Sequence, residues 1–265
     1  MNFVRNIVVS LLVIGFAVSS ASAKEYLRVL YVFDAKTTNY SQYIMLKKAD
    51  NLNIQLNRSF SNSKLSGYIS FTRVGTIKLD ISNGGSLYKT SERYRKYKKP
   101  SSLGSVQKQF KADIVVTIMD TGRYDLCGQA IDIPWSYLDF QDPDNAFVFL
   151  NSNSRRNCFD SSTLLAHEVG HIFGLHHGQY NANSYNDSSH FYSAGYNNGF
   201  GVDVNWGIDY GTIMVRDAVR NNTFSNPNRY DCGTILNSSN TCGNSNANAV
   251  KFIKKWAKYY NKRGG

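Results

Sequence analysis

Residues 167–177 constrain the fold of this chain more than any other segment. They read H-E-V-G-H-I-F-G-L-H-H. His167 and His171 are four residues apart, so on an α-helix their side chains lie one turn from each other and can bind one metal ion. Zinc suits such a site, because it takes imidazole nitrogens in a tetrahedral geometry and leaves one position for water. The segment therefore predicts a helix that carries a metal site.

The remaining residues of this segment suit catalysis at that ion. Glu168 is turned by about 100° from His167 around the helix axis, which favours a base beside the metal over a ligand. Gly174 stands where the helix can end in the left-handed conformation that glycine adopts readily. The chain can then turn back and bring His177 to the metal as a third ligand. The alternative is a helix whose histidines lie on the surface, but five such fixed positions arise by chance in roughly one window per million.

The segment matches the pattern H-E-x-x-H-x-x-G-x-x-H and so resembles the metzincin zinc peptidases. In that clan a tight turn with a methionine lies beneath the metal. Residues 211–215, G-T-I-M-V, stand at the expected place and resemble the turn of secreted bacterial reprolysin-like (adamalysin-like) enzymes. Without the zinc motif, Met214 would more simply be interpreted as a core residue. The resemblance implies a zinc metalloendopeptidase with Met214 in its methionine turn.

Two further segments carry this resemblance. Residues 127–132, C-G-Q-A-I-D, are similar to the C-G-x-A edge strand of reprolysin-like enzymes, whose unpaired backbone groups bind an extended peptide as one more strand. The alternative is an ordinary loop before Pro134. Residues 223–227, T-F-S-N-P, are similar to the segment that follows the methionine turn in bacterial relatives. The edge strand implies four substrate-binding residues: Gly128, Gln129, Ala130 and Ile131.

The resemblance implies hydrolysis of extended polypeptides by a water molecule on one catalytic zinc ion. Zinc held by three neutral imidazoles keeps a double positive charge, which lowers the pKa of its bound water toward about 7. Glu168 would take the proton of this water and hand it to the leaving amine. Some relatives in the wider clan place a tyrosine two residues after the turn methionine. This chain has Arg216 there, which leaves a second oxyanion donor unassigned, with Arg216 an untested candidate.

The surroundings of the third ligand depart from the family. Only His177 fits the family spacing, so we expect its neighbour His176 either to lie on the surface or to support the metal site without binding the metal. Reprolysins usually follow the third histidine with aspartate, but Gly178 stands here. A supporting hydrogen bond would then come from another residue, such as Asp209. We expect His190, in a polar stretch, to be structural or exposed. Structural calcium occurs in this clan, but no ligand cluster in the sequence calls for it.

The N-terminal residues have the pattern of a signal peptide. Residues 1–23 combine a basic residue, Arg5, with an apolar run from Ile7 to Val18 and the small residues A-S-A at a cleavage site. A run of about 12 residues is short for a membrane anchor, and no later segment is apolar enough to span a membrane. We therefore expect a secreted protein, extracellular or periplasmic. Only residues 24–26 precede the first expected strand, so no propeptide is expected.

Four cysteines in an exported chain indicate two disulfides. They can pair in three ways, and the sequence alone does not choose among them. We favour Cys127–Cys158 and Cys232–Cys242, because the second pair closes a short polar loop. The rival interpretation is a metal site built from cysteines and histidines, but the spacings contain no C-x-x-C.

The chain is strongly basic. It has 30 lysines and arginines against 19 aspartates and glutamates, a net charge of +11, which becomes +10 once the leader with Arg5 is removed. Basic residues gather at 91–99 and 251–263, interleaved with tyrosine, a pattern that can indicate nucleic-acid binding. An exported protein rarely meets nucleic acid, so we expect none and favour attraction to acidic or glycosylated proteins. The alternative function is an inactive or weak metzincin-like module that binds such surfaces, and the intact Glu168 argues against it.

The pattern of the whole chain favours an α+β fold of the metzincin type, in one catalytic domain over residues 24–265. The upper lobe, about residues 24–174, should contain a twisted mixed sheet with helices. The smaller lower lobe, about residues 175–265, should be irregular, above all at 179–205, and end in a helix. Zinc should lie in the cleft between the lobes. We expect a monomer.

Local patterns predict the individual elements. Strands are expected at residues 27–33, 68–74, 76–80, 114–119, 127–132 and 146–150. Helices are expected at 40–57, 86–98, 101–110 and 246–261, besides the metal-binding helix, which Ser161, Ser162 or Thr163 should cap. The first helix should bury a stripe of four residues, Met45, Ala49, Leu52 and Leu56.

Overall fold

The computed structural model describes residues 24–81, 86–97, 101–122, 125–131, 146–153, 162–179, 198–202, 210–214, 219–220, 222–230, 242–243, 247–257 and 259. The expected signal peptide lies outside the described residues and stays a prediction. Among the described helices, none is long and apolar enough to cross a membrane.

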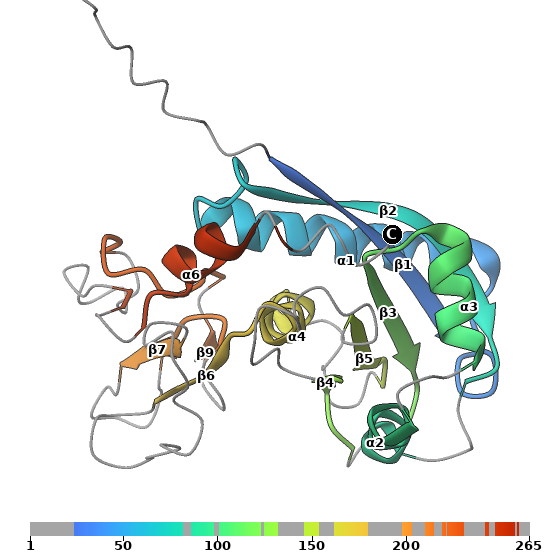
Figure 1. Ribbon diagram of the computed structural model, residues 1–265. Helices are drawn as coiled ribbons and strands as arrows, with labels where there is room; N and C mark the ends of the chain where they lie inside the picture. Colours follow the sequence, from blue (N-terminus) through green and yellow to red (C-terminus); the bar gives the residue numbers. More distant parts are fainter. Residues whose placement is uncertain are drawn as a thin grey trace, which may run out of the picture.

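The centre of the fold is a five-stranded mixed sheet (Figure 1), as expected. Its strands lie in the order β2-β1-β3-β5-β4, and all are parallel to their neighbours except β4, which is antiparallel to β5. The apolar strand β3 occupies the middle, because both its faces are covered by other elements and all six of its residues are buried. The strands are β1 (Glu25–Asp34), β2 (Ile69–Leu79), β3 (Ile114–Met119), β4 (Gly128–Ala130) and β5 (Phe147–Asn151).

The strand β2 corrects the prediction of two separate strands at 68–74 and 76–80. The pairing with β1 continues through this region, and it steps over one residue, Val74, so that Val29 lies opposite Arg73 and Leu30 opposite Gly75. A bulge of this kind absorbs an extra residue without ending the strand. At Gly75 the ring of Phe110 packs directly on the strand, where a Cβ atom would come within 2.6 Å of it.

Helices cover both faces of the sheet. On one face, α1 (Gln42–Asn62) and α4 (Leu164–Ile172) share a hydrophobic cluster with α6 (Ala249–Trp256). On the other, α2 (Leu87–Tyr97) and α3 (Ser101–Phe110) contribute to a second cluster. Helix α1 buries its expected stripe and continues to Asn62, five residues beyond the expected end.

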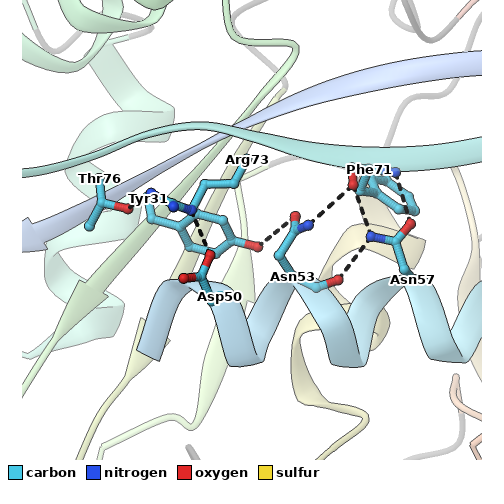
Figure 2. A network of polar contacts seen from close by, with 7 residues as sticks. All are labelled: Tyr31, Asp50, Asn53, Asn57, Phe71, Arg73 and Thr76. Atoms are coloured by element: carbon cyan, nitrogen blue, oxygen red, sulfur yellow. Dashed lines mark hydrogen bonds and ion pairs between the residues drawn. The ribbon is translucent and has the colours of Figure 1, made fainter. Parts of the chain in front are cut away.

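Polar side chains of α1 attach this helix to β2 (Figure 2). The side-chain amide of Asn57 donates to the carbonyl oxygen of Phe71 at 2.9 Å and accepts from the Phe71 N–H at 3.0 Å. Asn53 donates to the same carbonyl at 3.1 Å, and Asp50 forms an ion pair with Arg73 at 2.8 Å. Because β2 is the edge strand of the sheet, these amides satisfy backbone groups that would otherwise be open to another strand.

The C-terminal part corrects a second prediction. Residues 198–202, expected to be irregular, form a strand that pairs in parallel with the strand directly after α4. The segment reads N-G-F-G-V, and its asparagine and two glycines weaken the local preference for a strand, so pairing with a neighbour stabilises it. The second sheet has the order β6-β7-β8-β9, with β6 (His176–Gln179), β7 (Asn198–Val202), β8 (Tyr210–Gly211) and β9 (Val219–Arg220). The division of the chain into two lobes of one domain stays a prediction.

Candidate metal centre

The helix α4 carries the centre, and all nine of its residues are buried. It begins after Thr163, one of the three predicted capping residues, whose side chain makes no capping hydrogen bond. Thr163 has helical dihedral angles (φ −112°, ψ −9°), whereas a residue that caps a helix by its side chain usually has extended ones.

The end of α4 matches the expectation from Gly174. This glycine has a positive φ of 80°, and its N–H donates to the carbonyl of His171 at 2.8 Å. The N–H of Leu175 donates to the carbonyl of Gly170 at 2.9 Å. These two bonds form a Schellman motif, which ends the helix and reverses the chain. The reversal leads directly into β6 and its histidines.

The structure brings His167, His171 and His177 together. The Nε2 atom of His177 lies 3.1 Å from Nε2 of His167 and 3.0 Å from Nε2 of His171. The first two histidines are buried, whereas His177 is exposed. Their ligand atoms lie within 4.8 Å of one another, as expected for a group that can hold one metal ion.

Backbone carbonyl groups fix the orientation of two of these rings. Nδ1 of His167 lies 2.7 Å from the carbonyl oxygen of Ile213, and Nδ1 of His171 lies 2.8 Å from that of Leu175. A carbonyl oxygen can only accept, so both Nδ1 atoms carry the proton and both Nε2 atoms present lone pairs. The Nε2 atom of a neutral His177 carries at most one proton, so it cannot donate a full hydrogen bond to both of these Nε2 atoms.

A cation accounts for this arrangement. Tetrahedral zinc with Zn–N bonds of about 2.0–2.1 Å would set its nitrogens about 3.3 Å apart, close to the separations of 3.0 and 3.1 Å. Carbonyl groups that hold the second ring nitrogen are the usual support of metal-bound histidine. The three imidazoles therefore fit zinc in number, atom type and spacing.

The methionine turn lies directly against α4. Met214 is fully buried, and a Cβ atom at Gly170 would overlap its sulfur. Ile213, the residue before it, provides the carbonyl that orients His167, and its own N–H donates to Thr223 at 2.8 Å. The turn thus supports a histidine of the centre through its backbone, while its methionine fills the space beneath the helix.

Glu168 faces the short strand β4. The residue is only 5% exposed, and its Oε2 atom accepts a hydrogen bond of 2.8 Å from the N–H of Ala130. The same carboxylate lies on Gly128, where a Cβ atom would come within 2.6 Å of Oε1. The acid on α4 and the edge strand are therefore in direct contact.

The segment that carries the three histidines matches a known protein family. Residues 50–178, which include the whole zinc motif, match the family model described as metallo-peptidase family M12B, reprolysin-like. Residues 50–178 are reprolysin-like. The matched family is one of metallo-peptidases, and three histidines within the matched residues form the candidate zinc site.

The remaining comparisons concern the fold. Among solved structures, 113 chains match. One of them, "Structure of a chaperone-substrate complex", is similar over 90% of this chain with a TM-score of 0.61 and 20% identity. The match spans 35% of the length of that solved chain. No curated protein matches.

The four predicted substrate-binding residues have different surroundings. Gly128 and Ala130 contact Glu168 through their backbones. The side chain of Gln129 accepts a hydrogen bond from Ser91 of α2. Ile131 is buried in the second hydrophobic cluster and its N–H donates to Phe147 on β5. Strand β4 is also shorter than expected, since it ends at Ala130.

Other predicted residues lie near the centre or outside the described residues. His176 is half-buried and is not part of the histidine group in the described residues, as expected. Neither of the two described cysteines, Cys127 and Cys242, is a free thiol. Five of the predicted positions lie outside the described residues: Cys158, His190, Asp209, Arg216 and Cys232. Gly178 is described only as part of strand β6.

Sequence reasoning missed the groups that support the centre. The carbonyls of Ile213 and Leu175 orient the histidines, yet a backbone group leaves no trace in residue type. Gly128 and Gly170 are visible in the sequence as glycines. The lack of a side chain allows Glu168 to approach Gly128 and Met214 to approach Gly170. The presence of glycine is a signal that could have been used for Gly128, which belongs to the C-G-x-A pattern.

The helix α2 gives the edge strand a basic neighbour. It carries four basic residues and one acidic residue, a net charge of +3. Glu92 pairs with Arg95 at 2.7 Å, which leaves Lys89, Arg93 and Lys96 exposed on the helix. The helix is attached to the strand region by hydrogen bonds from Ser91 to Gln129 and from the N–H of Leu87 to Asp125.

Proposed function

We propose that this metallopeptidase is a secreted endopeptidase that cuts extended polypeptides and uses Glu168 as its general base. The observation that carries the proposal is the place of Glu168: it follows His167 on α4, it is buried, and one of its carboxylate oxygens is held by Ala130. A buried carboxylate one residue from a metal ligand has a clear role in hydrolysis, whereas a protein that only binds a partner does not need it.

In the proposed reaction, an extended substrate pairs with free backbone groups along β4. When bound by the three imidazoles, zinc supplies a Lewis acid for the peptide carbonyl and the attacking water. Glu168 accepts a proton from that water on a carboxylate oxygen and passes it to the nitrogen of the leaving amine. Ile213 and Leu175 keep the rings of His167 and His171 in place through their carbonyls.

The test compares wild type with Glu168→Ala on casein and gelatin. The variant should keep one zinc per chain and lose about 10²- to 10⁴-fold in cleavage rate, the usual contribution of a positioned base. Zinc content measured by atomic spectroscopy and the melting temperature serve as controls for the site and the fold. Equal cleavage by the two proteins would rule out the mechanism.

Acidic or glycosylated polypeptides are the substrate class that the charge distribution supports. Lys89, Arg93 and Lys96 lie on a helix attached to the strand that we propose binds substrate. Their field would attract acidic side chains flanking the scissile bond. The same surface supports the alternative function, an inactive module that binds acidic surfaces, and the Glu168→Ala comparison separates the two.

Charge reversal on α2 tests this preference. Wild type and the triple variant Lys89→Glu, Arg93→Glu and Lys96→Glu would be compared on two peptides with one scissile sequence and either acidic or neutral flanks. We expect the ratio of kcat/KM for the acidic to the neutral peptide to fall by about 5- to 10-fold and the wild-type ratio to decrease in high salt. The control reverses three exposed lysines on α1 and α6: Lys47, Lys251 and Lys255. An equal decrease in the control variant would assign the effect to net charge alone.

Export and disulfides complete the proposal. Residues 1–23 would be removed on secretion, and Cys127–Cys158 and Cys232–Cys242 would form in the oxidising compartment. The absence of free thiols at Cys127 and Cys242 supports the second statement. Peptide mapping of secreted protein by mass spectrometry, without reduction, tests both the cleavage site and the two pairings.

A further inference from the structure

Among the described strands, β4 lies at the edge of the sheet, and the direction of its backbone groups can be assigned. On the side of β5, the N–H of Ile131 donates to Phe147 at 3.0 Å and the carbonyl of Cys127 accepts from Asn151 at 2.8 Å. In an antiparallel pair the backbone groups of successive residues point alternately toward and away from the partner strand. The backbone groups of Gly128 and Ala130 therefore point away from β5.

One of these edge groups is already engaged. The N–H of Ala130 donates to Oε2 of Glu168 at 2.8 Å, so this donor is held by the enzyme's own acid. A hydrogen bond from a backbone N–H to a carboxylate is among the stronger kinds in proteins, and it fixes the position of the oxygen that accepts it.

Gly128 makes the second contact with this carboxylate. A Cβ atom at this position would lie 2.6 Å from Oε1, 2.9 Å from Cγ and 3.0 Å from Cδ of Glu168. Among the described glycines with a positive φ are Gly122 and Gly174, but not Gly128, so the backbone here would accept an alanine. The carboxylate of Glu168 is therefore the reason for glycine at this position.

We propose that Gly128 and the Ala130 N–H form a cradle that positions the Glu168 carboxylate for proton transfer, which makes both of them positioning residues for the reaction. Ala130 holds Oε2 by its N–H, and Gly128 gives the carboxylate room to lie flat on the strand. The inference rests on the proposed function, in which Glu168 is the base. It also assigns to the edge strand a role besides substrate pairing, because one of its N–H groups serves the acid on α4.

The decisive variant is Gly128→Ala. The atoms in conflict with the new methyl group belong to the end of a flexible side chain, so Glu168 can rotate away while the fold stays intact. A displacement of about 1 Å at a catalytic group can cost on the order of 10²-fold in rate. We expect kcat to decrease by about 10- to 100-fold with KM changed less than twofold and zinc content unchanged. Loss of substrate pairing would instead raise KM.

The matched control is Gly104→Ala in α3. A Cβ atom at Gly104 meets nothing within 4 Å, so this variant makes the same chemical change away from the site. It should cleave as wild type does. Melting temperatures of both variants check that the fold is retained.

A double-mutant cycle tests whether Gly128 acts through Glu168. In the Glu168→Ala background the methyl group has no carboxylate to displace, so adding Gly128→Ala should leave the residual rate within about twofold. Retention of the full Gly128→Ala decrease in this background would overturn the inference, while the proposed function would stand. Failure of the proposed function appears separately, as undiminished cleavage by Glu168→Ala alone.

A measurement without zinc or substrate completes the test. Hydrogen exchange of the Ala130 amide, followed by NMR in the metal-free protein, reports the bond to Glu168 directly. We expect exchange at Ala130 to be at least tenfold faster in Glu168→Ala and in Gly128→Ala than in wild type and in Gly104→Ala. Unchanged exchange in Glu168→Ala would mean that the bond does not hold the carboxylate, and would overturn the inference even if Gly128→Ala fails to fold.

Discussion

At the scale of single residues, the centre depends on groups that restrict the orientation of others. The carbonyls of Ile213 and Leu175 accept from Nδ1 of His167 and His171 and so orient Nε2 of both rings toward the metal site. Met214 fits under α4 because residue 170 has no side chain. The two carbonyls determine where the lone pairs of the histidines lie.

A buried tyrosine gives a prediction for the alkaline range. Burial raises the pKa of Tyr94 to about 12, and its hydroxyl lies 3.5 Å from the carbonyl oxygen of Ile81. Because the pKa is higher in the folded than in the unfolded chain, where it is about 10, the neutral hydroxyl contributes stability that is complete below pH 10. This contribution is lost as the pH rises through 12.

Urea unfolding at pH 8 to 12 measures the effect. The free energy of unfolding of wild type should decline above pH 10, and Tyr94→Phe should decline less, by on the order of 1–2 kcal/mol at pH 12. Tyr31 is fully buried, which also raises its pKa, so some decline will remain in the variant. Tyr88→Phe, on the exposed side of the same helix, should follow wild type. Parallel curves for wild type and Tyr94→Phe would contradict the prediction.

The residues with chemistry of their own were predictable from the sequence, and those that act by shape or backbone were not. His167, Glu168, His171 and His177 have spacings that a helix and one turn convert into a site. The bond from Ala130 to Glu168 requires knowing how far β4 lies from α4, and no local pattern contains that distance.

At the scale of elements, α1 protects the outer edge of the sheet. The amide of Asn57 pairs with both backbone groups of Phe71 as a neighbouring strand would (Figure 2). Replacement by alanine would leave a partly buried N–H without this acceptor. Asn57→Ala should therefore lower the free energy of unfolding by about 1–3 kcal/mol.

The conservative variant sharpens this prediction. Asn57→Asp keeps an acceptor for the Phe71 N–H but has no donor for the Phe71 carbonyl, which Asn53 still reaches. Urea unfolding should place it between wild type and Asn57→Ala, with the cleavage rate of all three alike. A loss below about 0.5 kcal/mol in Asn57→Ala would mean that water replaces the amide without cost.

Some elements with strong periodicity matched their predictions, whereas two strands formed by pairing did not. Helix α6 begins at Ala249, three residues after its expected start. Helix α3 and strand β3 have the expected bounds. Strand β2 was divided in the prediction because a bulge interrupts its alternation. Strand β7 was missed because its asparagine and glycines weaken the local preference for a strand. In both cases the partner strand, which is distant in sequence, supplies the stabilising bonds.

At the scale of the whole molecule, metal should link α4 to the second sheet, because His167 and His171 lie on the helix and His177 on β6. Zinc at about one hundred times its dissociation constant would stabilise the fold by about 2.7 kcal/mol. Chelation should then lower Tm by roughly 5–10 °C. Calorimetry with and without chelator measures this.

Two variants test whether zinc bound at this site causes the decrease in Tm. His177→Ala, at an exposed ligand, should remove most of the response to chelator, while Glu168→Ala should keep it. A full response in His177→Ala would place the stabilising metal elsewhere in the protein.

The short segment around Ser225 connects the end of the chain to the metal ligands. Its hydroxyl and carbonyl accept from the first residues of α6, Ala249 and Val250, at 2.9 and 3.1 Å. Two residues earlier, Thr223 holds Ile213, the residue that orients His167. Proteolysis that releases the last helix would remove the hydrogen bonds that hold Ser225 and would loosen Thr223 and Ile213. The ring of His167 would then lose its fixed orientation, so cleavage near α6 should weaken zinc binding.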